Sequence, residues 1–387
     1  MRHFDFLPEE EIDRLFLQPP REFGRTEDLT RLATGLGATL YSPATRPRLA
    51  ADIVRRSEQG VLSCVVCLED AVADPDLAAA ERNAICQLRA YAATERNRPL
   101  LFVRIRTAEQ IPMIVEGLAE HTDVLTGFVL PKFTEQSGAE LLETLVTTNQ
   151  QTGLRLLAMP VLESPAVIYA ESRIAELLGV WSLLDKYREL VLAVRIGATD
   201  LSSAYGLRRS RETSVYDVRV LADLIADVVN IFGRADGSGW LLTGPVWEYF
   251  PTPERIFKPQ LRESPFIAYS ERSLRAQLIA ADLDGLIREV ALDKANGFVG
   301  KAVIHPSHVA PVHALLVVTH EEYCDAVDIL GDPARTTGIL PSAYRNKMNE
   351  SKPHAAWARR VLARADVFGV ARETTSFVDL LGAGLHR

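Results

Sequence analysis

Short apolar runs alternate with longer amphipathic segments along most of the chain. The runs are apolar almost throughout, whereas the segments between them are rich in Ala, Leu and Arg, with apolar residues every three to four positions. The first pattern predicts strands buried on both faces, and the second predicts helices that cover them. The runs span 38–44, 61–70, 99–105, 127–133, 155–163, 189–201, 239–250 and 300–306.

Strands that alternate with helices form parallel β-α units, and eight units over about 270 residues fit a (β/α)8 TIM barrel. The alternative is an open doubly wound sheet. No G-x-G-x-x-G motif follows the first run, and the sequence contains no P-loop motif. Both absences disfavour the open sheet. We therefore expect an α/β protein built on a TIM barrel.

The segments outside these runs predict additions to the barrel. Residues 1–36 are expected to form an N-terminal helical extension, and the barrel domain then spans 37–315. A Pro- and aromatic-rich excursion at 245–275 follows the seventh run. Residues 316–387, with a loop at 331–353 before a last helix at 354–369, are expected to form a C-terminal helical lid or oligomer arm.

Composition narrows the class of protein. The chain of 387 residues is 47% hydrophobic and carries a net charge of −8, so no global basic surface favours nucleic acid or an anionic membrane. No apolar run approaches the roughly 18 residues that span a bilayer. The first residues, MRHFDFLPEEEIDRL, are too charged for a signal peptide. With only four scattered cysteines, a cytoplasmic, reduced protein is the expectation.

A C-x-x-C motif, Cys64 to Cys67, invites a metal or dithiol interpretation. It lies inside a predicted strand, where residues three apart point to opposite faces. A redox C-x-x-C normally opens a helix, and a zinc site needs two further ligands, whereas Cys86 and Cys324 are isolated. We therefore expect these cysteines to be small buried apolar residues.

Acidic residues recur at the ends of several predicted strands. Glu69 and Asp70 end the second, Glu163 the fifth and Asp200 the sixth. The strands of a barrel all end on one rim, where active sites are built. Carboxylates that converge there repel each other unless a cation lies among them, and an oxygen-rich set with few His or Cys favours Mg²⁺.

The same rim collects cationic side chains. Arg46 follows the first strand, Arg104 ends the third and Lys132 ends the fourth. Mg²⁺ between two acids with an Arg alongside suits a small dicarboxylate or 2-oxo acid, and such a cation stabilises an enolate. Each residue alone has the simpler interpretation of a loop cap or a surface ion pair. His305 is a candidate base, although a His before Pro at a strand end is more often structural.

Read in order, several segments resemble the superfamily of the citrate lyase beta subunit, malyl-CoA lyase and the HpcH/HpaI aldolases. The segment GFVGKAVIHPSHV is similar to that family's G-F-x-G-K-x-x-I-H-P-x-Q and is the most specific. The others resemble successive strand ends of the family, and all lie in order within about 38–315. They are LYSPATRP, CLEDAV, VRI, LPK, VLES and GATDLS.

The resemblance implies a role for each candidate residue. Glu163 and Asp200 would be the Mg²⁺ ligands, and Arg104 would anchor the substrate carboxylate. Glu69, Asp70 and Arg46 would line the site. Relatives have an acidic residue in a C-terminal M-I-D segment, which in some members reaches a neighbouring subunit's active site. Here the segment KMNESKPHAAWA offers Glu350 at that place.

The sequence also departs from the family's pattern. The two expected metal ligands are 37 residues apart (200 − 163), longer than the family's usual spacing. Arg106 stands where relatives often have Asn, and Arg208, Arg209 and Arg211 form a basic loop just after Asp200. That loop has two interpretations, a solvated Arg run or a site for a phosphate or a CoA-like tail.

These observations predict a Mg²⁺-dependent carbon–carbon lyase or aldolase. Its substrate would be a small carboxylate or 2-oxo acid, free or as a thioester of CoA or an acyl carrier, and the reaction would pass through an enolate. One alternative runs the same chemistry as condensation or thioester hydrolysis. Another is a non-catalytic assembly subunit. The tail that could reach a neighbour makes a homo-oligomer the expected assembly.

Overall fold

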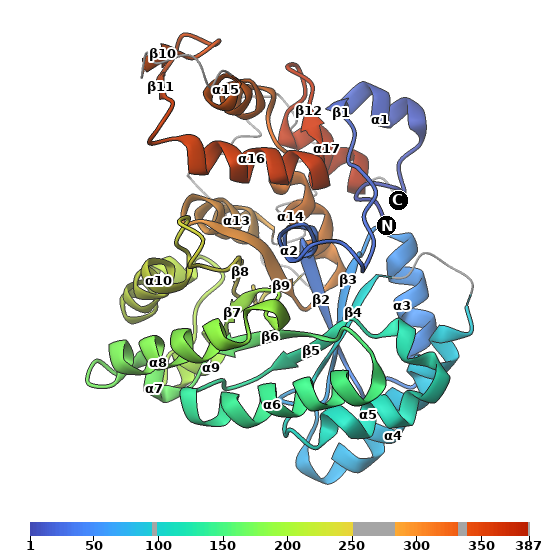
Figure 1. Ribbon diagram of the computed structural model, residues 1–387. Helices are drawn as coiled ribbons and strands as arrows, with labels where there is room; N and C mark the ends of the chain where they lie inside the picture. The colour runs from blue at the N-terminus through green and yellow to red at the C-terminus, as the bar shows by residue number, and fades with distance from the viewer. Residues whose placement is uncertain (95–98, 251–282, 332–338, 386–387) are drawn as a thin grey trace.

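A parallel barrel forms the body of the protein in the computed structural model, which describes residues 1–94, 99–250, 283–331 and 339–385 (Figure 1). Its strands follow chain order, and the pairing of β9 with β2 closes it. The strands are β2 (Ala38–Pro43), β3 (Ser63–Cys67), β4 (Leu100–Arg104), β5 (Gly127–Leu130), β6 (Leu157–Leu162), β7 (Val194–Ile196), β8 (Leu242–Gly244) and β9 (Phe298–Val303). The predicted TIM barrel is confirmed, and the open doubly wound sheet is wrong.

Helices cover the outside of the barrel because each presents an apolar stripe to it. In α10, for example, Leu221, Leu224, Ile225 and Val228 are buried at helical spacing. The covering helices are α3 (Leu49–Glu58), α4 (Leu77–Ala92), α5 (Gln110–Leu118), α6 (Glu135–Thr152), α7 (Pro165–Ile168), α8 (Arg173–Lys186), α9 (Ala198–Ser203), α10 (Arg219–Phe232), α13 (Asp284–Ala295) and α14 (Val309–Leu316).

Short 3-10 turns link several of these elements. They are η1 (Asp74–Asp76), η2 (Ala119–Val124), η3 (Arg188–Leu190), η4 (Val215–Asp217) and η5 (Pro306–His308).

The N-terminal extension contains α1 (Glu9–Leu15), β1 (Phe16–Gln18) and α2 (Leu29–Gly35). Leu32 and Leu36 share one apolar cluster with Leu62, Leu100 and Leu157, which lie at or just before the starts of barrel strands. Helix α2 therefore closes the amino-terminal end of the barrel. The extension is helical as expected, with the short strand β1 between its two helices.

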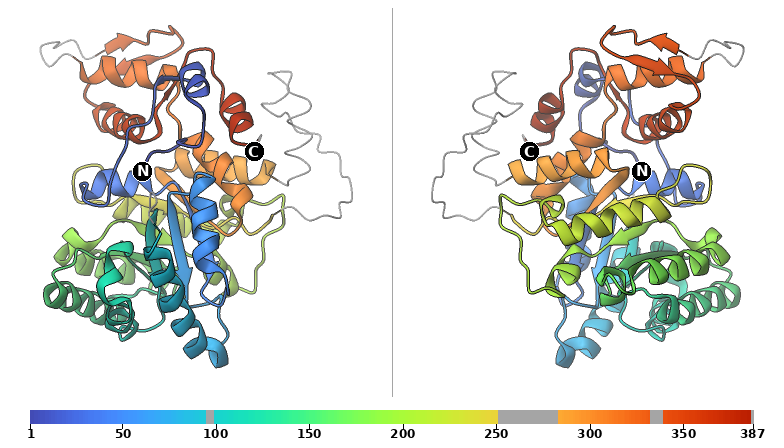
Figure 2. Two further views of the ribbon diagram at one scale, coloured as in Figure 1. Left: turned by 90° about the vertical axis from the view of Figure 1, so that its right-hand side faces the viewer. Right: turned by 90° about the vertical axis from the view of Figure 1, so that its left-hand side faces the viewer.

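The C-terminal segment packs beside this extension, as Figures 1 and 2 show. Strand β1 pairs antiparallel with β12, and α16 contacts α2. Two expectations for this segment are corrected. The region 331–353, expected to be a loop, includes the hairpin β10–β11, and α16, expected to be the last helix, is followed by α17. The elements are α15 (His320–Leu330), β10 (Ile339–Pro341), β11 (Met348–Glu350), α16 (Ala355–Phe368), β12 (Val370–Ala371) and α17 (Phe377–Leu385).

The expected excursion at 245–275 lies outside the described residues from 251 onward. The domain boundaries at 36 and 315 stay predictions. In the part of the chain that the structure describes, we find no helix with the length and apolar character of a membrane span.

Candidate active site

The candidate residues that follow barrel strands meet at the carboxyl-terminal rim. Glu69 and Asp70 follow β3, Arg104 is the last residue of β4 and Lys132 follows β5. Glu163 comes directly after β6, and Asp200 lies in the first turn of α9, after β7. The rim places these side chains within reach of one another, as parallel strands in a barrel predict.

Arg104 is the centre of this group. Its Nη2 lies 2.7 Å from Glu163 Oε1, 2.8 Å from Glu69 Oε2 and 3.1 Å from Asp70 Oδ2. The Arg104 side chain is only 12% exposed, so these charge-assisted contacts are shielded from water. Its Nε is buried without a hydrogen-bond partner among the described residues.

Lys132 is a second cation at the same rim. Its Nζ lies 2.5 Å from Glu69 Oε1 and 3.2 Å from Asp70 Oδ1, while its backbone N–H donates to Glu163 Oε1 at 2.9 Å. The backbone adopts a positive φ of 46°, which is uncommon for a residue with a side chain. Lys132 therefore contacts three of the four acids, one of them through its main chain.

Glu163 and Asp200 form a pair of adjacent carboxylates. Burial raises the pKa of Glu163 to about 7 against the opposing effect of Arg104, and the Asp200 charge raises it further. Burial, and then the Asp70 charge, also raise the pKa of Asp200. Both groups therefore lie where the carboxylate form is costly unless cations offset it.

The pKa values of Glu69 and Asp70 shift in opposite directions. Burial and the Asp70 side chain raise the pKa of Glu69. Burial also acts to raise the pKa of Asp70, but the hydrogen bond with Glu69 and the charges of Arg104 and Lys132 lower it overall. Asp70 is the more exposed of the two and reaches the solvent side of the rim.

A family model describes most of the chain. The model of the C–C bond lyases of the TIM-barrel fold matches residues 30–370. The chain belongs to this family. No curated protein sequence matched the chain.

Several solved structures share the fold of this chain. A CitE protein of Mycobacterium tuberculosis, in complex with magnesium, acetoacetate and coenzyme A, is 20% identical with a TM-score of 0.51, over 86% of this chain and 99% of that one. A citrate lyase of Burkholderia xenovorans is 15% identical with a TM-score of 0.60, over 87% and 93%. Haloferax volcanii malate synthase is 14% identical with a TM-score of 0.50, over 76% and 75%.

Two predicted site residues of this C–C bond lyase make no hydrogen bond or ion pair with the cluster among the described residues. Arg46 is half exposed and forms an ion pair with Asp52 at 2.9 Å. It lines a cavity of about 180 Å³ with Tyr41, Arg56 and His305. The His305 ring stacks on Phe250 at 5.1 Å, and its Nδ1 lies 2.8 Å from Ser307 Oγ.

Glu350 also lies away from the cluster within one chain. It ends β11, and its backbone N–H donates to His354 Nδ1 at 3.0 Å. The neighbouring Asn349 donates to Asp325 Oδ1 of α15. Figure 1 shows β11 at the top of the molecule beside α15, and α7 and α9 at the lower left. A role for Glu350 in the site therefore requires a second copy of the chain.

The cysteines of the C-x-x-C motif are free, and both are buried in β3. Burial raises the pKa of Cys64 to about 12, so its thiol is not a nucleophile at neutral pH. The predicted packing role of these residues agrees with this geometry.

Neither interpretation of the basic loop holds for all three of its arginines. Arg209 is buried, with Nη1 at 2.5 Å from Glu289 Oε2 and Nη2 donating to the Val246 carbonyl. Arg208 is exposed, and the Arg211 guanidinium lies 5.5 Å from the Tyr249 ring centre. Arg209 is thus a structural residue rather than a solvated or anion-binding one.

Arg106 binds the backbone of the turn after β3. Its Nε donates to the Leu68 carbonyl at 2.8 Å, and its Nη2 donates to the carbonyls of Glu69, at 3.1 Å, and Val72. Its Nη1 pairs with Asp74 at 2.6 Å. Arg106 therefore holds the turn that presents Glu69 and Asp70.

Arg195 is a residue that sequence reasoning missed. It is 2% exposed in β7, with its Nη1 3.9 Å from Met159 Sδ and its guanidinium 5.3 Å from the Tyr41 ring centre. Its register neighbour Thr243 is also buried, and both Arg195 Nη2 and the Thr243 hydroxyl lack a partner among the described residues. An Arg inside the apolar run LAVRIG was the signal that could have found it.

Proposed function

We propose that this C–C bond lyase is a Mg²⁺-dependent enzyme that cleaves a carbon–carbon bond in a small carboxylate or 2-oxo acid. The observation that carries the proposal is the meeting of Glu163 and Asp200 beside Arg104 at the carboxyl-terminal rim. Metal ligands and an anion anchor in one place suit a substrate whose carbonyl oxygen becomes negatively charged during the reaction.

The donor set fits Mg²⁺. Among the described residues no group of three or more His, Cys, Asp or Glu side chains could hold a metal ion by itself, whereas Mg²⁺ usually takes only one or two carboxylates together with water and substrate oxygens. Glu163 and Asp200 would supply those carboxylates. When bound, Mg²⁺ supplies the positive charge that stabilises an enolate.

The remaining residues of the cluster position the substrate and the acids. Arg104 would orient the substrate carboxylate, since a guanidinium binds two oxygens at once. Glu69 and Asp70 line the site and hold Arg104 and Lys132 through the ion pairs at the rim. Lys132 would add a second positive charge facing the substrate, because its side chain is half exposed.

The proposed substrate class follows from the residues of the site and from the ligands of a protein with a similar fold. The CitE protein was solved with acetoacetate and coenzyme A, a small oxo acid and a thioester carrier. We propose that this enzyme takes a small 2-oxo acid or dicarboxylate, free or as a thioester of CoA or an acyl carrier. We further propose a homo-oligomer in which Glu350 of one chain faces the site of the next.

A metal titration tests the two carboxylates. Calorimetry should show that wild-type protein binds Mg²⁺ and that Glu163→Gln and Asp200→Asn lose this binding. Glu143→Gln, a matched change on the exposed face of α6, should behave as wild type. Unchanged far-UV circular dichroism would show that the variants fold.

Product analysis tests the reaction. The wild-type protein is incubated with Mg²⁺ and a panel of 2-oxo acids, hydroxy dicarboxylates and acyl-CoA esters, and products are identified by mass spectrometry. We expect cleavage that falls at least about 10²-fold in either carboxylate variant. Full activity in both variants contradicts the assignment. Condensation products or thioester hydrolysis products would instead identify one of the alternative reactions. If the wild-type protein neither binds Mg²⁺ nor turns over any compound of the panel, the chain is an assembly subunit.

A further inference from the structure

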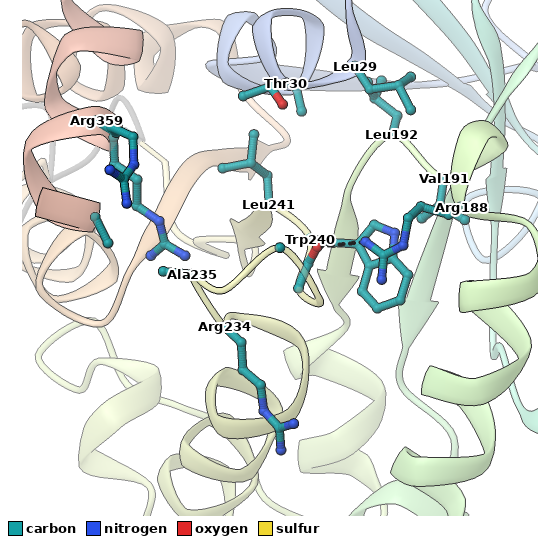
Figure 3. Close-up of a pocket in the computed structure, with 15 residues that line it drawn as sticks. Leu29, Thr30, Arg188, Val191, Leu192, Arg234, Ala235, Trp240, Leu241 and Arg359 are labelled. Atoms are coloured by element: carbon teal, nitrogen blue, oxygen red, sulfur yellow. Dashed lines mark hydrogen bonds between the residues drawn. The ribbon is translucent and has the colours of Figure 1, made fainter.

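A cleft of about 370 Å³ (Figure 3) lies at the amino-terminal end of the barrel. Glu163, which follows β6, lies at the opposite, carboxyl-terminal end. It is bounded by α2, by α16 and by the segments that lead into β7 and β8. Its volume is in the range of small-molecule sites. The cleft thus joins the N-terminal extension, the barrel and the C-terminal segment, far from the proposed chemistry.

The walls of the cleft combine apolar side chains with arginines and include no Asp or Glu. Leu29, Val191, Leu192 and Leu241 supply apolar surface, and Trp240 supplies an aromatic ring. The arginines that line it are Arg188, Arg234, Arg359 and Arg360. This concentration of positive charge stands out in a chain with a net charge of −8, and it favours an anionic ligand.

Two of these arginines already serve the fold. Arg188 donates to the carbonyls of Ser238 and Gly239, pairs with Asp185, and lies 4.1 Å above the Trp240 ring. Arg234 donates to the Asn230 carbonyl, and Figure 3 shows its side chain directed away from Arg359 and Trp240. Arg188 therefore fixes the loop that forms one wall.

The other two face the cleft from α16 and keep donors available. Arg359 is exposed and makes no hydrogen bond or ion pair within the described residues. Arg360 donates from Nη2 to the Gly233 carbonyl at 2.7 Å, which leaves its other guanidinium donors available. The Trp240 Nε1 is buried, with the residue 8% exposed, and has no partner among the described residues. A buried donor without an acceptor is costly, and a ligand acceptor would satisfy it.

A second cavity of about 580 Å³ continues the cleft along α16, sharing Thr30, Leu241 and Arg360 with it. Its charged residues Lys294 and Arg364 are both paired with Glu322, at 2.9 Å and 2.8 Å. Arg359 therefore lines the first cleft alone and Arg360 lines both, whereas the second cavity offers room for the remainder of a larger ligand.

We propose that this cleft binds a small organic phosphate through Arg359 and Arg360. Two adjacent guanidinium groups suit a phosphate because it carries up to two negative charges and three acceptor oxygens. The apolar part of the ligand lies against Leu29, Leu192 and Trp240. The bound ligand bridges α2, α16 and the barrel, so it stabilises the folded chain by mass action.

Calorimetry and thermal unfolding of the full-length protein test this site with phenyl phosphate as the probe. We expect binding and a higher Tm with phenyl phosphate, weaker binding of inorganic phosphate, and none of phenol. Arg359→Gln should weaken phenyl phosphate binding at least about tenfold, since it removes a charged hydrogen-bond donor. Arg359 has no partner in the described structure, so this variant is expected to fold normally.

Arg82→Gln is the matched control, because it removes the same charge from an exposed position on α4 and should leave binding unchanged. Mg²⁺ binding at the rim should be the same in wild type and Arg359→Gln, which separates this site from the proposed lyase chemistry. The proposal is overturned if wild type does not bind phenyl phosphate, or if Arg359→Gln binds it equally well. Equal binding of inorganic phosphate would indicate an adventitious ion only, and equal binding of benzoate would overturn the phosphate class.

Discussion

The carboxylate of Glu163 occupies the space that a side chain at Gly197 would fill. A Cβ at position 197 would stand 2.0 Å from Glu163 Oε2 and 2.5 Å from Glu163 Cβ. Gly197 precedes α9, and its backbone φ of −97° is open to any residue. The glycine of the GATD segment is therefore required for the close approach of the two strand ends rather than for its backbone conformation.

Gly197→Ala should displace the Glu163 carboxylate while leaving the barrel folded. Because a shift of about 1 Å at a reacting group can cost about 10²-fold, we expect a loss of that order in the Mg²⁺-dependent turnover, together with weaker Mg²⁺ binding. Gly24→Ala is the control, since a Cβ there meets nothing within 4 Å. Wild-type Mg²⁺ affinity in Gly197→Ala would contradict the placement of Glu163 in the metal site.

Arg106→Lys should loosen the turn that carries Glu69 and Asp70. Lysine keeps the charge but cannot replace a guanidinium that donates to the carbonyls of Leu68, Glu69 and Val72. We expect turnover to fall at least about tenfold, with Mg²⁺ affinity maintained, because a single lost charge-assisted hydrogen bond is worth about 1.5–3 kcal/mol and about 1.4 kcal/mol is tenfold in rate. Steady-state kinetics and calorimetry on the same preparations measure both quantities.

Asp74→Asn provides the matched control for Arg106. The Asp74 side chain is 92% exposed, so its ion pair with Arg106 contributes at most about 1 kcal/mol. If Asp74→Asn lowers turnover as much as Arg106→Lys does, the ion pair rather than the carbonyl contacts positions the turn.

The barrel and most of its rim could be predicted from the sequence because both depend on local patterns. Strands buried on both faces read as apolar runs, and a barrel gathers the ends of all its strands. Glu163 and Asp200 each end such a run, so the barrel alone predicts that both lie at the same rim. The family-like segments VLES and GATDLS carry the same two residues.

The errors arise where long-range contacts decide the outcome. Arg209 sits among other arginines and looks solvated, but its partner Glu289 is 80 residues away. Strands β1 and β12 are too short to show an alternating pattern, and they pair across almost the whole chain. No local pattern reports these partners.

Buried histidines should make the fold sensitive to mild acid. Burial lowers the pKa of His3 to about 3 and of His308 to about 4, and it lowers the pKa of His313 well below its ordinary value. The unfolded chain takes up these protons near pH 6.5, whereas the folded chain resists until much lower pH. Stability is therefore full above about 6.5 and falls toward pH 4, by up to about 1.4 kcal/mol per pH unit for each histidine.

Urea unfolding at several pH values between 7.5 and 5 measures this slope. His308→Gln keeps a donor for the Tyr249 carbonyl, which His308 Nε2 contacts at 2.9 Å, but removes one titrating group. Its pH slope should be smaller than that of wild type. His121→Gln, at a partly exposed position, should keep the wild-type slope, and an unchanged slope in His308→Gln would argue against the buried-histidine explanation.

Lys301 of the GFVGK segment belongs to a buried ionic network, so its replacement should destabilise the whole barrel. Its Nζ lies 2.9 Å from Glu289 Oε1 and 2.7 Å from Asp293 Oδ2, and all three side chains are at most 3% exposed. Lys301→Met would leave Asp293 without its cation and Glu289 with Arg209 alone. Breaking such a buried pair typically costs about 3–5 kcal/mol, and denaturant unfolding should show a loss of that size.

Lys352→Met, at an exposed position before α16, should stay near wild type. A loss below about 1 kcal/mol in Lys301→Met would mean that water or a protonated Asp293, whose pKa burial raises to about 6, compensates the missing charge.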